Sequence, residues 1–278
     1  MAWAAAPPRL VALDLLHAEC LLTLELRPAA LANLPLYRRL VAEPAPPAGL
    51  PDLGPAQEPN LEFLAALAPD AILAPSGLRA SLARLGQVAP VLWLPTLAPE
   101  GDATGLATLL LRRIAALAGR EAEAAAEEAR FAAALASARA RLAPCAGRPV
   151  FLARLLEDGR NIALFGGNSM LGHVLQALGL RNAWPGRGNA AGVAVAGLES
   201  LFAMPEAWLV HFDRGAETGR ALARLAEGAL WPHLPALLAR RVLALPVVYP
   251  NGGLVSARRF AGALAEALPR AVGESPHG

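Results

Sequence analysis

The sequence predicts an α/β protein with two Rossmann-like lobes joined by a single long helix. Strand-like apolar runs alternate with helical runs in both halves of the chain, which is typical of parallel sheets covered by helices. Between the halves, Arg120 to Ala143 is rich in Ala, Glu and Arg and lacks Pro and Gly, so it predicts one helix of roughly 35 Å. We therefore expect an N-terminal lobe over 9–118, a connecting helix over 119–143 and a C-terminal lobe over 144–278.

The elements of the N-terminal lobe follow from short apolar runs and from helical periodicity. Apolar residues recur at the i, i+3, i+4 spacing of a helix from Thr104 to Leu117, and Gly119 predicts its C-cap. The segment from Glu43 to Pro59 is rich in Pro and Gly, so we expect a long loop there. The other predicted elements are strands at Leu10–Leu13, Ala71–Ala74 and Val91–Leu94, a helix from about His17 and a helix over Leu78–Leu85.

The C-terminal lobe repeats this alternation of strands and helices. A short helix, a Pro-acid turn and a buried strand occur once in each lobe, at Leu61–Leu73 and at Leu198–Leu209. This internal repeat predicts two lobes of similar topology, with a ligand held between them at the carboxyl ends of the strands. The predicted strands are Val150–Leu155, Ile162–Phe165, Trp208–Phe212 and Val242–Val248, and the predicted helices are Ser169–Leu178, Thr218–Leu225 and Ser256–Leu268.

Composition excludes several classes of protein. The formal net charge is only +2 and the Arg residues are scattered, so no nucleic-acid partner is predicted. No run of about 18 apolar residues could span a bilayer, and we do not expect an integral membrane protein. Cys20 and Cys145 lack a C-x-x-C or His-spaced companion, so they are predicted to be buried free thiols.

The sequence disfavours two kinds of chemistry, hydrolysis by a catalytic triad and metal binding. The turn before Ser169, with Asp213 and His233 following in the order of a hydrolase triad, suggests an α/β hydrolase. The final Gly of the G-x-S-x-G motif is missing, and Asn168 as a helix N-cap explains the turn without catalysis. The histidines do not pair at i, i+3 or i+4, and a metal site of His17 with its neighbours in the sequence is disfavoured. No cofactor, no metal and no enzymatic activity are predicted.

The order of several segments resembles the periplasmic substrate-binding proteins of iron-siderophore ABC transporters, and within them the hydroxamate-binding members. The resemblance covers nearly the whole chain. It is carried by Arg9–Asp14, Tyr37-Arg38 with Glu43-Pro44, Glu58–Glu62, Phe165–Ser169, Asn182–Trp184 and Leu230-Trp231.

This resemblance implies a receptor that captures a ferric siderophore in a shallow cleft between its lobes and delivers it to an ABC permease. It implies a periplasmic monomer, with the siderophore as transported ligand rather than cofactor. A haem or corrinoid receptor of the same fold is the alternative. Ala4-Ala5-Ala6 has the small-residue pattern of a signal-peptidase site, so we expect export, with the signal itself absent from this chain or truncated.

The resemblance also selects candidate site residues. Two ligand residues expected in hydroxamate binders are replaced, because Ala56 stands where an Arg is expected and Ala191 where an aromatic is expected. Glu62 and Glu199 take equivalent places in the two echoed motifs and are predicted to dock on Arg residues of the permease. The remaining candidates for binding the ligand at strand ends are His17, Ser76, Arg79, Asn189 and Tyr249.

Overall fold

The computed structural model describes residues 8–98, 101–186 and 188–274, which form two compact units. Of the described residues, unit 1 contains 8–98, 104–131 and 251–256, and unit 2 contains 101–103, 132–186, 188–250 and 257–274. The Ala4-Ala5-Ala6 pattern lies outside the described residues. Among the residues that are described, no helix is long and apolar enough to cross a membrane.

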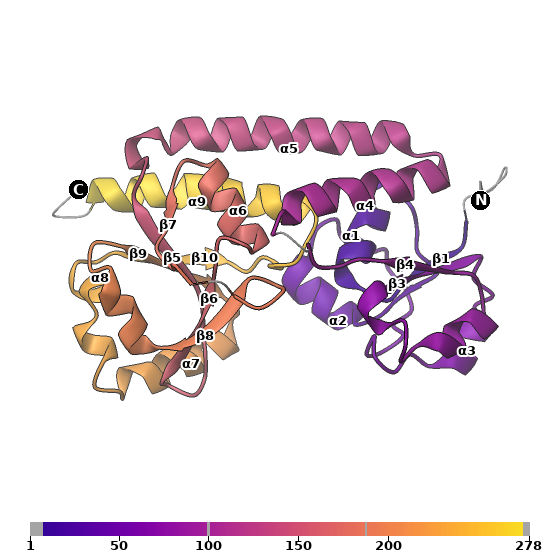
Figure 1. Ribbon diagram of the computed structural model, residues 1–278, viewed down its shortest axis with the longest axis horizontal. Helices are drawn as coiled ribbons and strands as arrows, with labels where there is room; N and C mark the ends of the chain where they lie inside the picture. The colour runs from indigo at the N-terminus through magenta and orange to yellow at the C-terminus, as the bar shows by residue number, and fades with distance from the viewer. Residues whose placement is uncertain (1–7, 99–100, 187, 275–278) are drawn as a thin grey trace. The chain divides into compact units, whose positions relative to one another are not determined.

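Unit 1 is built on a four-stranded parallel sheet in the order β2-β1-β3-β4. Figure 1 labels β1, β3 and β4 of this sheet. Three of its strands were predicted almost to the residue. The two-residue β2 was missed because it is too short to produce an alternation in the sequence. The strands are β1 (Leu10–Ala12), β2 (Ala30–Leu31), β3 (Ala71–Pro75) and β4 (Val91–Leu94).

The helices of unit 1 are short apart from the last. They are α1 (Leu15–Thr23), α2 (Leu34–Leu36), a π-helical turn at Tyr37–Val41, α3 (Leu61–Ala66) and α4 (Ala103–Ala118). Residues 42–60 contain no helix and no extended strand, as predicted for the Pro-rich loop. One apolar cluster joins Ile72 and Ala74 of β3 to Leu64 of α3 and to Leu85, and so fixes α3 on the sheet.

The predicted helix over Leu78–Leu85 is wrong. The structure has two 3₁₀ turns there, Ser76–Leu78 and Ala83–Gln87. The Ser81 hydroxyl donates a hydrogen bond to the Leu78 carbonyl at 3.0 Å, and such local side-chain bonds compete with helical ones. Gly77 and Gly86 further weaken helix formation at each end.

The predicted connecting helix is present as α5 (Glu121–Arg141), which begins in unit 1 and ends in unit 2 (Figure 1). It follows α4 after Gly119, whose φ of +64° is the left-handed cap conformation that glycine adopts most readily. Arg112 of α4 forms a bidentate ion pair with Glu128 of α5 and ties the two helices together. The chain also passes between the units near residues 98–104 and 250–257, which was not predicted.

Unit 2 contains a six-stranded mixed sheet rather than a copy of the first. Strands β10, β9 and β5 are parallel, while β6 and β8 are antiparallel to their neighbours. The antiparallel pairing arises because Asp158 and Gly159 form a tight turn between β5 and β6, in which the Asp158 carboxylate accepts two backbone N–H bonds. The strands are β5 (Pro149–Leu155), β6 (Asn161–Phe165), β7 (Arg181–Asn182), β8 (Val193–Gly197), β9 (Trp208–Asp213) and β10 (Val242–Pro246).

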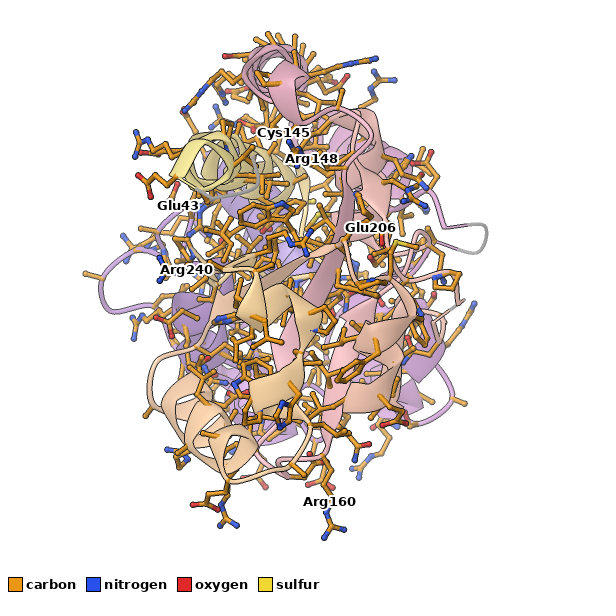
Figure 2. The ribbon with its side chains drawn as sticks, turned by 90° about the vertical axis from the view of Figure 1, so that its left-hand side faces the viewer. Glu43, Cys145, Arg148, Arg160, Glu206 and Arg240 are labelled. Atoms are coloured by element: carbon orange, nitrogen blue, oxygen red, sulfur yellow. The ribbon has the colours of Figure 1, made fainter. Side chains whose placement is uncertain are left out.

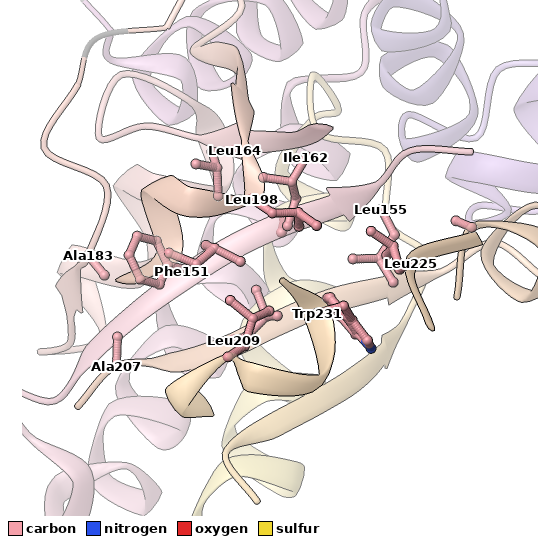
Figure 3. Close-up of a cluster of buried hydrophobic side chains, with 14 residues drawn as sticks. Phe151, Leu155, Ile162, Leu164, Ala183, Leu198, Ala207, Leu209, Leu225 and Trp231 are labelled. Carbon is pink, nitrogen blue, oxygen red and sulfur yellow. The ribbon is translucent and has the colours of Figure 1, made fainter. Parts of the chain in front are cut away.

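Helices cover both faces of this sheet. On one face, Phe151 and Leu209 of the strands pack with Leu225 and Trp231 in a buried apolar cluster (Figure 3). On the other face, the ring of Phe212 lies 5.9 Å from that of Phe260 in the last helix. Because both faces are buried, β9 is apolar apart from His211 and the terminal Asp213. The helices of unit 2 are α6 (Met170–Ala177), α7 (Ala216–Ala226), α8 (Pro235–Leu238) and α9 (Leu254–Glu274).

Both cysteines are buried free thiols, as predicted. Cys145 lies beside Arg148 just before β5 (Figure 2). Burial raises the pKa of the Cys145 thiol, although the Arg148 guanidinium lowers it. Neither cysteine therefore has the depressed pKa of a reactive thiolate.

Candidate functional site

Two candidate ligand residues follow β3 directly in unit 1. Ser76 and Arg79 are both exposed, at the carboxyl end of a strand in a parallel sheet, which is where ligands of α/β folds bind. Arg79 ends a 3₁₀ turn and does not begin a helix, contrary to the prediction. Its guanidinium makes no ion pair or side-chain hydrogen bond with any other described residue, so it is available to a ligand.

His17 differs from the other candidates because its side chain has no exposed surface. It lies in α1 and is 0% exposed. Burial lowers the pKa of His17, and the nearby Asp14 carboxylate and Pro95 carbonyl only oppose this shift. A neutral, enclosed imidazole is reached by a ligand only after local opening of unit 1.

Glu19, two residues further along α1, forms a buried polar contact with Ser256. Its carboxylate accepts a hydrogen bond from the Ser256 backbone N–H at 2.9 Å and another from the Ser256 hydroxyl at 2.6 Å. Both residues are buried, at 1% and 0% exposure. The carboxylate therefore caps the first turn of α9, where unpaired N–H groups and the helix dipole favour a negative charge.

The glycines after Tyr249 serve this contact. A Cβ at Gly252 would lie 2.3 Å from the Ser256 hydroxyl, and a Cβ at Gly253 would lie 2.9 Å from a Glu19 oxygen. In the structure these glycines let the backbone approach Glu19 and Ser256. Tyr249 itself is half-buried, three residues before Gly252.

Ser169 in unit 2 is a structural residue. Its hydroxyl donates to the Gly166 carbonyl at 2.7 Å and accepts the Gly172 N–H at 3.0 Å, and the side chain is buried. Ser169, rather than the predicted Asn168, is thus the N-cap of α6. Because its hydroxyl is enclosed and used twice, the hydrolase alternative has no accessible nucleophile here.

Asn189 holds its own loop together. Its amide oxygen accepts the N–H groups of Ala191 and Val193, at 2.9 and 3.1 Å. The side chain of Asn168 donates to the Asn189 carbonyl at 3.2 Å. Asn189 is exposed, so it combines a structural bond with access to solvent.

Next to this loop, unit 2 has a polar cavity of about 550 Å³ that sequence reasoning missed. Side chains of Asn168, Gln176 and Asn182 line it, and the Nδ1 atom of His173 lies 3.3 Å from an Asp102 oxygen at its wall. Phe165–Ser169 and Asn182–Trp184, which the sequence singled out by resemblance, contribute to this wall. No group of three His, Cys, Asp or Glu residues suited to a metal ion occurs in the described parts of the chain.

The two predicted docking acids occupy equivalent positions in their units. Glu62 lies in the first turn of α3, which Asn60 caps by accepting the Phe63 N–H at 2.9 Å. Glu199 lies in the first turn of a 3₁₀ helix, Leu198–Ala203. Both carboxylates are exposed, and neither forms an ion pair with another described residue.

Two α/β units connected by a long helix, with candidate ligand residues after their strands, have the architecture of a substrate-binding protein. The periplasmic binding protein family matches residues 10–249, and the chain belongs to this family. The predicted family and the predicted two-lobed α/β fold class are thereby confirmed. Family membership also confirms the prediction of a binding protein.

The chain is similar to proteins of iron uptake. It is 29% identical over 262 residues to the iron(3+)-hydroxamate-binding protein FhuD of Escherichia coli (strain K12), covering 94% of this chain and 87% of that protein. The structure of FhuD from Vibrio cholerae, bound to Fe³⁺-Desferal, matches with a TM-score of 0.85 at 30% identity, over 96% of this chain and 99% of that one. The triscatecholate siderophore binding protein FeuA from Bacillus subtilis matches with a TM-score of 0.74 at 17% identity, over 97% and 95%, which shows the fold alone.

Proposed function

We propose that this protein is a periplasmic receptor that binds a ferric siderophore and delivers it to an ABC importer. The observation that carries the proposal is the full-length similarity to FhuD of Vibrio cholerae, which was solved with Fe³⁺-Desferal. Membership of the periplasmic binding protein family supports the same role. Residues 9–118 and 144–278 would act as the two binding lobes, with 119–143 as their connection.

Four residues are proposed to contact the siderophore: Ser76, Arg79, Asn189 and Tyr249. Arg79 supplies a free cation and Tyr249 an aromatic ring, and a polar, often anionic chelate with an apolar periphery needs both. Arg79 would take the role of the Arg that is expected at the position of Ala56. His17 would take part only if unit 1 opened locally.

The role of Arg79 is tested by titrating Arg79→Ala with ferric Desferal and with ferric catecholates. A lost hydrogen bond to a charged group costs about 1.5 to 3 kcal/mol, which is an affinity loss of roughly 10- to 150-fold. Arg84→Ala is the matched control, because Arg84 is an exposed cation on the next 3₁₀ turn. Equal affinities for the two variants would remove Arg79 from the site.

Tyr249→Ala should weaken binding by a smaller stacking contribution of about 0.5 to 1.5 kcal/mol. Tyr249→Phe keeps the ring and is its control. If Tyr249→Phe lost as much affinity as Tyr249→Ala, the hydroxyl rather than the ring would be the contact.

Glu62 and Glu199 are proposed to dock on cationic residues of the permease. Two exposed, unpaired carboxylates in equivalent turns of the two units support this. The double variant Glu62→Ala plus Glu199→Ala should bind permease vesicles more weakly and with a smaller salt dependence. Glu121→Ala, another exposed acid at a helix start, should bind like the unaltered protein. If the double variant bound permease vesicles as well as the unaltered protein does, the proposed docking role of Glu62 and Glu199 would be ruled out.

Export and the monomeric state complete the proposal. The family is one of periplasmic binding proteins, so a precursor with a cleavable signal peptide is expected in the native host. Cell fractionation locates the native protein, and light scattering of the purified chain measures its mass. Recovery only from cytosol would contradict export, and a dimer mass would contradict the monomer.

A further inference from the structure

Glu199, the proposed docking acid of unit 2, lines a surface hollow of about 460 Å³. The hollow lies between the turn that joins β5 to β6, the first turn of the 3₁₀ helix Leu198–Ala203 and the end of α7. Leu230, which is exposed, forms part of its wall. The Glu199 carboxylate makes no ion pair or hydrogen bond with another described residue, so it is available to a cationic side chain of a partner protein.

The Glu199 carboxylate lies directly over the backbone of Gly197, two residues earlier. A Cβ at Gly197 would lie 2.2 Å from each carboxylate oxygen and 2.5 Å from the Glu199 Cδ atom. These are the three nearest atoms that such a Cβ would meet outside the adjoining residues, so the carboxylate takes the space that glycine leaves open. Any other residue at position 197 would push the carboxylate away, since both oxygens would overlap its Cβ.

The backbone conformation does not require glycine at position 197. Its φ of −69° and ψ of 156° are extended values that any residue adopts. In the internal repeat, Asn60 stands at the equivalent position of unit 1, so a turn of this kind also begins with a residue that has a side chain. Glycine loses more conformational freedom on folding than any other residue, and what its missing side chain admits here is the Glu199 carboxylate.

Gly197 is a fixed support for this contact. It ends β8, where it pairs with Asn161 of β6. Its carbonyl accepts a hydrogen bond from the Ser200 hydroxyl at 2.8 Å. The next residue, Leu198, is buried in the apolar cluster of unit 2 (Figure 3). Because the chain is held by these contacts, an added methyl group would displace the flexible Glu199 side chain rather than the backbone.

We propose that Gly197 is a positioning residue for Glu199: because it has no side chain, it lets the carboxylate fold back over the backbone at the hollow, where the carboxylate meets a cationic side chain of the permease. The inference rests on the proposed function, since it assigns Gly197 to the same docking surface. An exposed glutamate otherwise samples many rotamers. A carboxylate that is already in place loses less conformational freedom on binding.

The expected result for Gly197→Ala is an affinity for vesicles that carry the ABC permease about twofold to fivefold lower, as for the loss of an exposed ion pair. The salt dependence of binding should become smaller. Glu199→Ala should show the same loss, and combining the two substitutions should cost almost nothing further. If the added methyl group instead obstructed docking by its bulk, its loss would add to that of Glu199→Ala.

Two measurements separate positioning from a folding defect. The urea midpoint of Gly197→Ala should equal or exceed that of the unaltered protein, because alanine fits this conformation and restricts the unfolded chain. Gly219→Ala is the matched control, since Gly219 is an exposed glycine of unit 2 with no atom within 4 Å of its Cβ position apart from the adjoining residues and the backbone of its own helix. This control should bind permease vesicles like the unaltered protein.

Nuclear magnetic resonance of the isolated protein gives a readout that does not need the permease. Nuclear Overhauser effects should connect the Hα protons of Gly197 to the side-chain methylene protons of Glu199, because the carboxylate lies over the Gly197 backbone. In Gly197→Ala, the effects between the Hα proton of residue 197 and these methylene protons should weaken. Their absence from the unaltered protein would overturn the positioning role.

The binding outcomes distinguish this inference from the proposed function. If Glu199→Ala binds permease vesicles as well as the unaltered protein does, the docking role in the proposed function fails, and this inference fails with it. If Glu199→Ala loses affinity while Gly197→Ala keeps it, or if the two losses add in the double variant, the positioning role alone is overturned and Glu199 remains a docking residue.

Discussion

Alanine substitution at two helical glycines should change stability in opposite directions. Gly172 is buried in α6, where a Cβ would lie 2.1 Å from the Gly166 carbonyl oxygen and 3.0 Å from the Asn182 side chain. Gly262 is exposed in α9, and apart from the adjoining residues and backbone of its own helix no atom lies within 4 Å of its Cβ position. Helix propensity favours alanine by about 0.5 to 1 kcal/mol at either site, and overpacking costs typically 1 to 3 kcal/mol.

The clash at Gly172 is with backbone, which has little room to move. We therefore expect Gly172→Ala to lower the free energy of unfolding by about 1 to 2 kcal/mol net and Gly262→Ala to raise it by about 0.5 to 1 kcal/mol. Urea unfolding followed by tryptophan fluorescence and by circular dichroism measures both, with separate fits if the two units unfold in separate transitions. A stabilised Gly172→Ala would refute the close packing of α6 on Gly166.

Two other changes test unit 2. Ser169→Ala should lower the free energy of unfolding by about 1 to 2 kcal/mol in the same urea assay, because the Gly172 N–H loses the hydroxyl that accepts its hydrogen bond. An unchanged midpoint of urea unfolding would contradict the capping role. Burial raises the pKa of Glu217, but Arg214 and Arg154 together hold it below 4.5. The Glu217 carboxylate thus binds a proton less readily in the folded protein than in the unfolded chain. The free energy of unfolding should therefore exceed that of Glu217→Gln by roughly 1 kcal/mol above pH 4.5, and this difference should shrink as the pH falls below 4.5. A difference independent of pH would contradict the pairing of Glu217 with Arg214 and Arg154.

Most strands could be predicted from the sequence because both faces of each sheet are covered. Val91–Leu94 is an uninterrupted apolar run, Trp208–Phe212 is apolar apart from His211, and burial on two faces favours such runs. Strand β8 was missed, since its Val, Ala and Gly residues are only partly buried and produce no strong pattern. The antiparallel pairing of β6 also escaped prediction, because the Asp158-Gly159 turn was not recognised as a hairpin signal.

The candidate site was harder to predict because its contacts are distant in sequence. Asn168 and Ser169 are equally good N-caps by type, and only the backbone conformation selects Ser169. Nothing in the local sequence around Glu19 or around Gly252-Gly253 indicates that these residues meet. Their meeting at Ser256 depends on tertiary structure, which no local pattern encodes.

The binding of a ferric siderophore is tested most directly by titrating the purified protein with ferric Desferal, a ferric catecholate, haem and cobalamin, and following tryptophan fluorescence. We expect saturable, one-to-one quenching by a ferric siderophore, and none by the iron-free chelator at the same concentrations. Quenching by haem or cobalamin alone, with no response to any ferric siderophore, would contradict it.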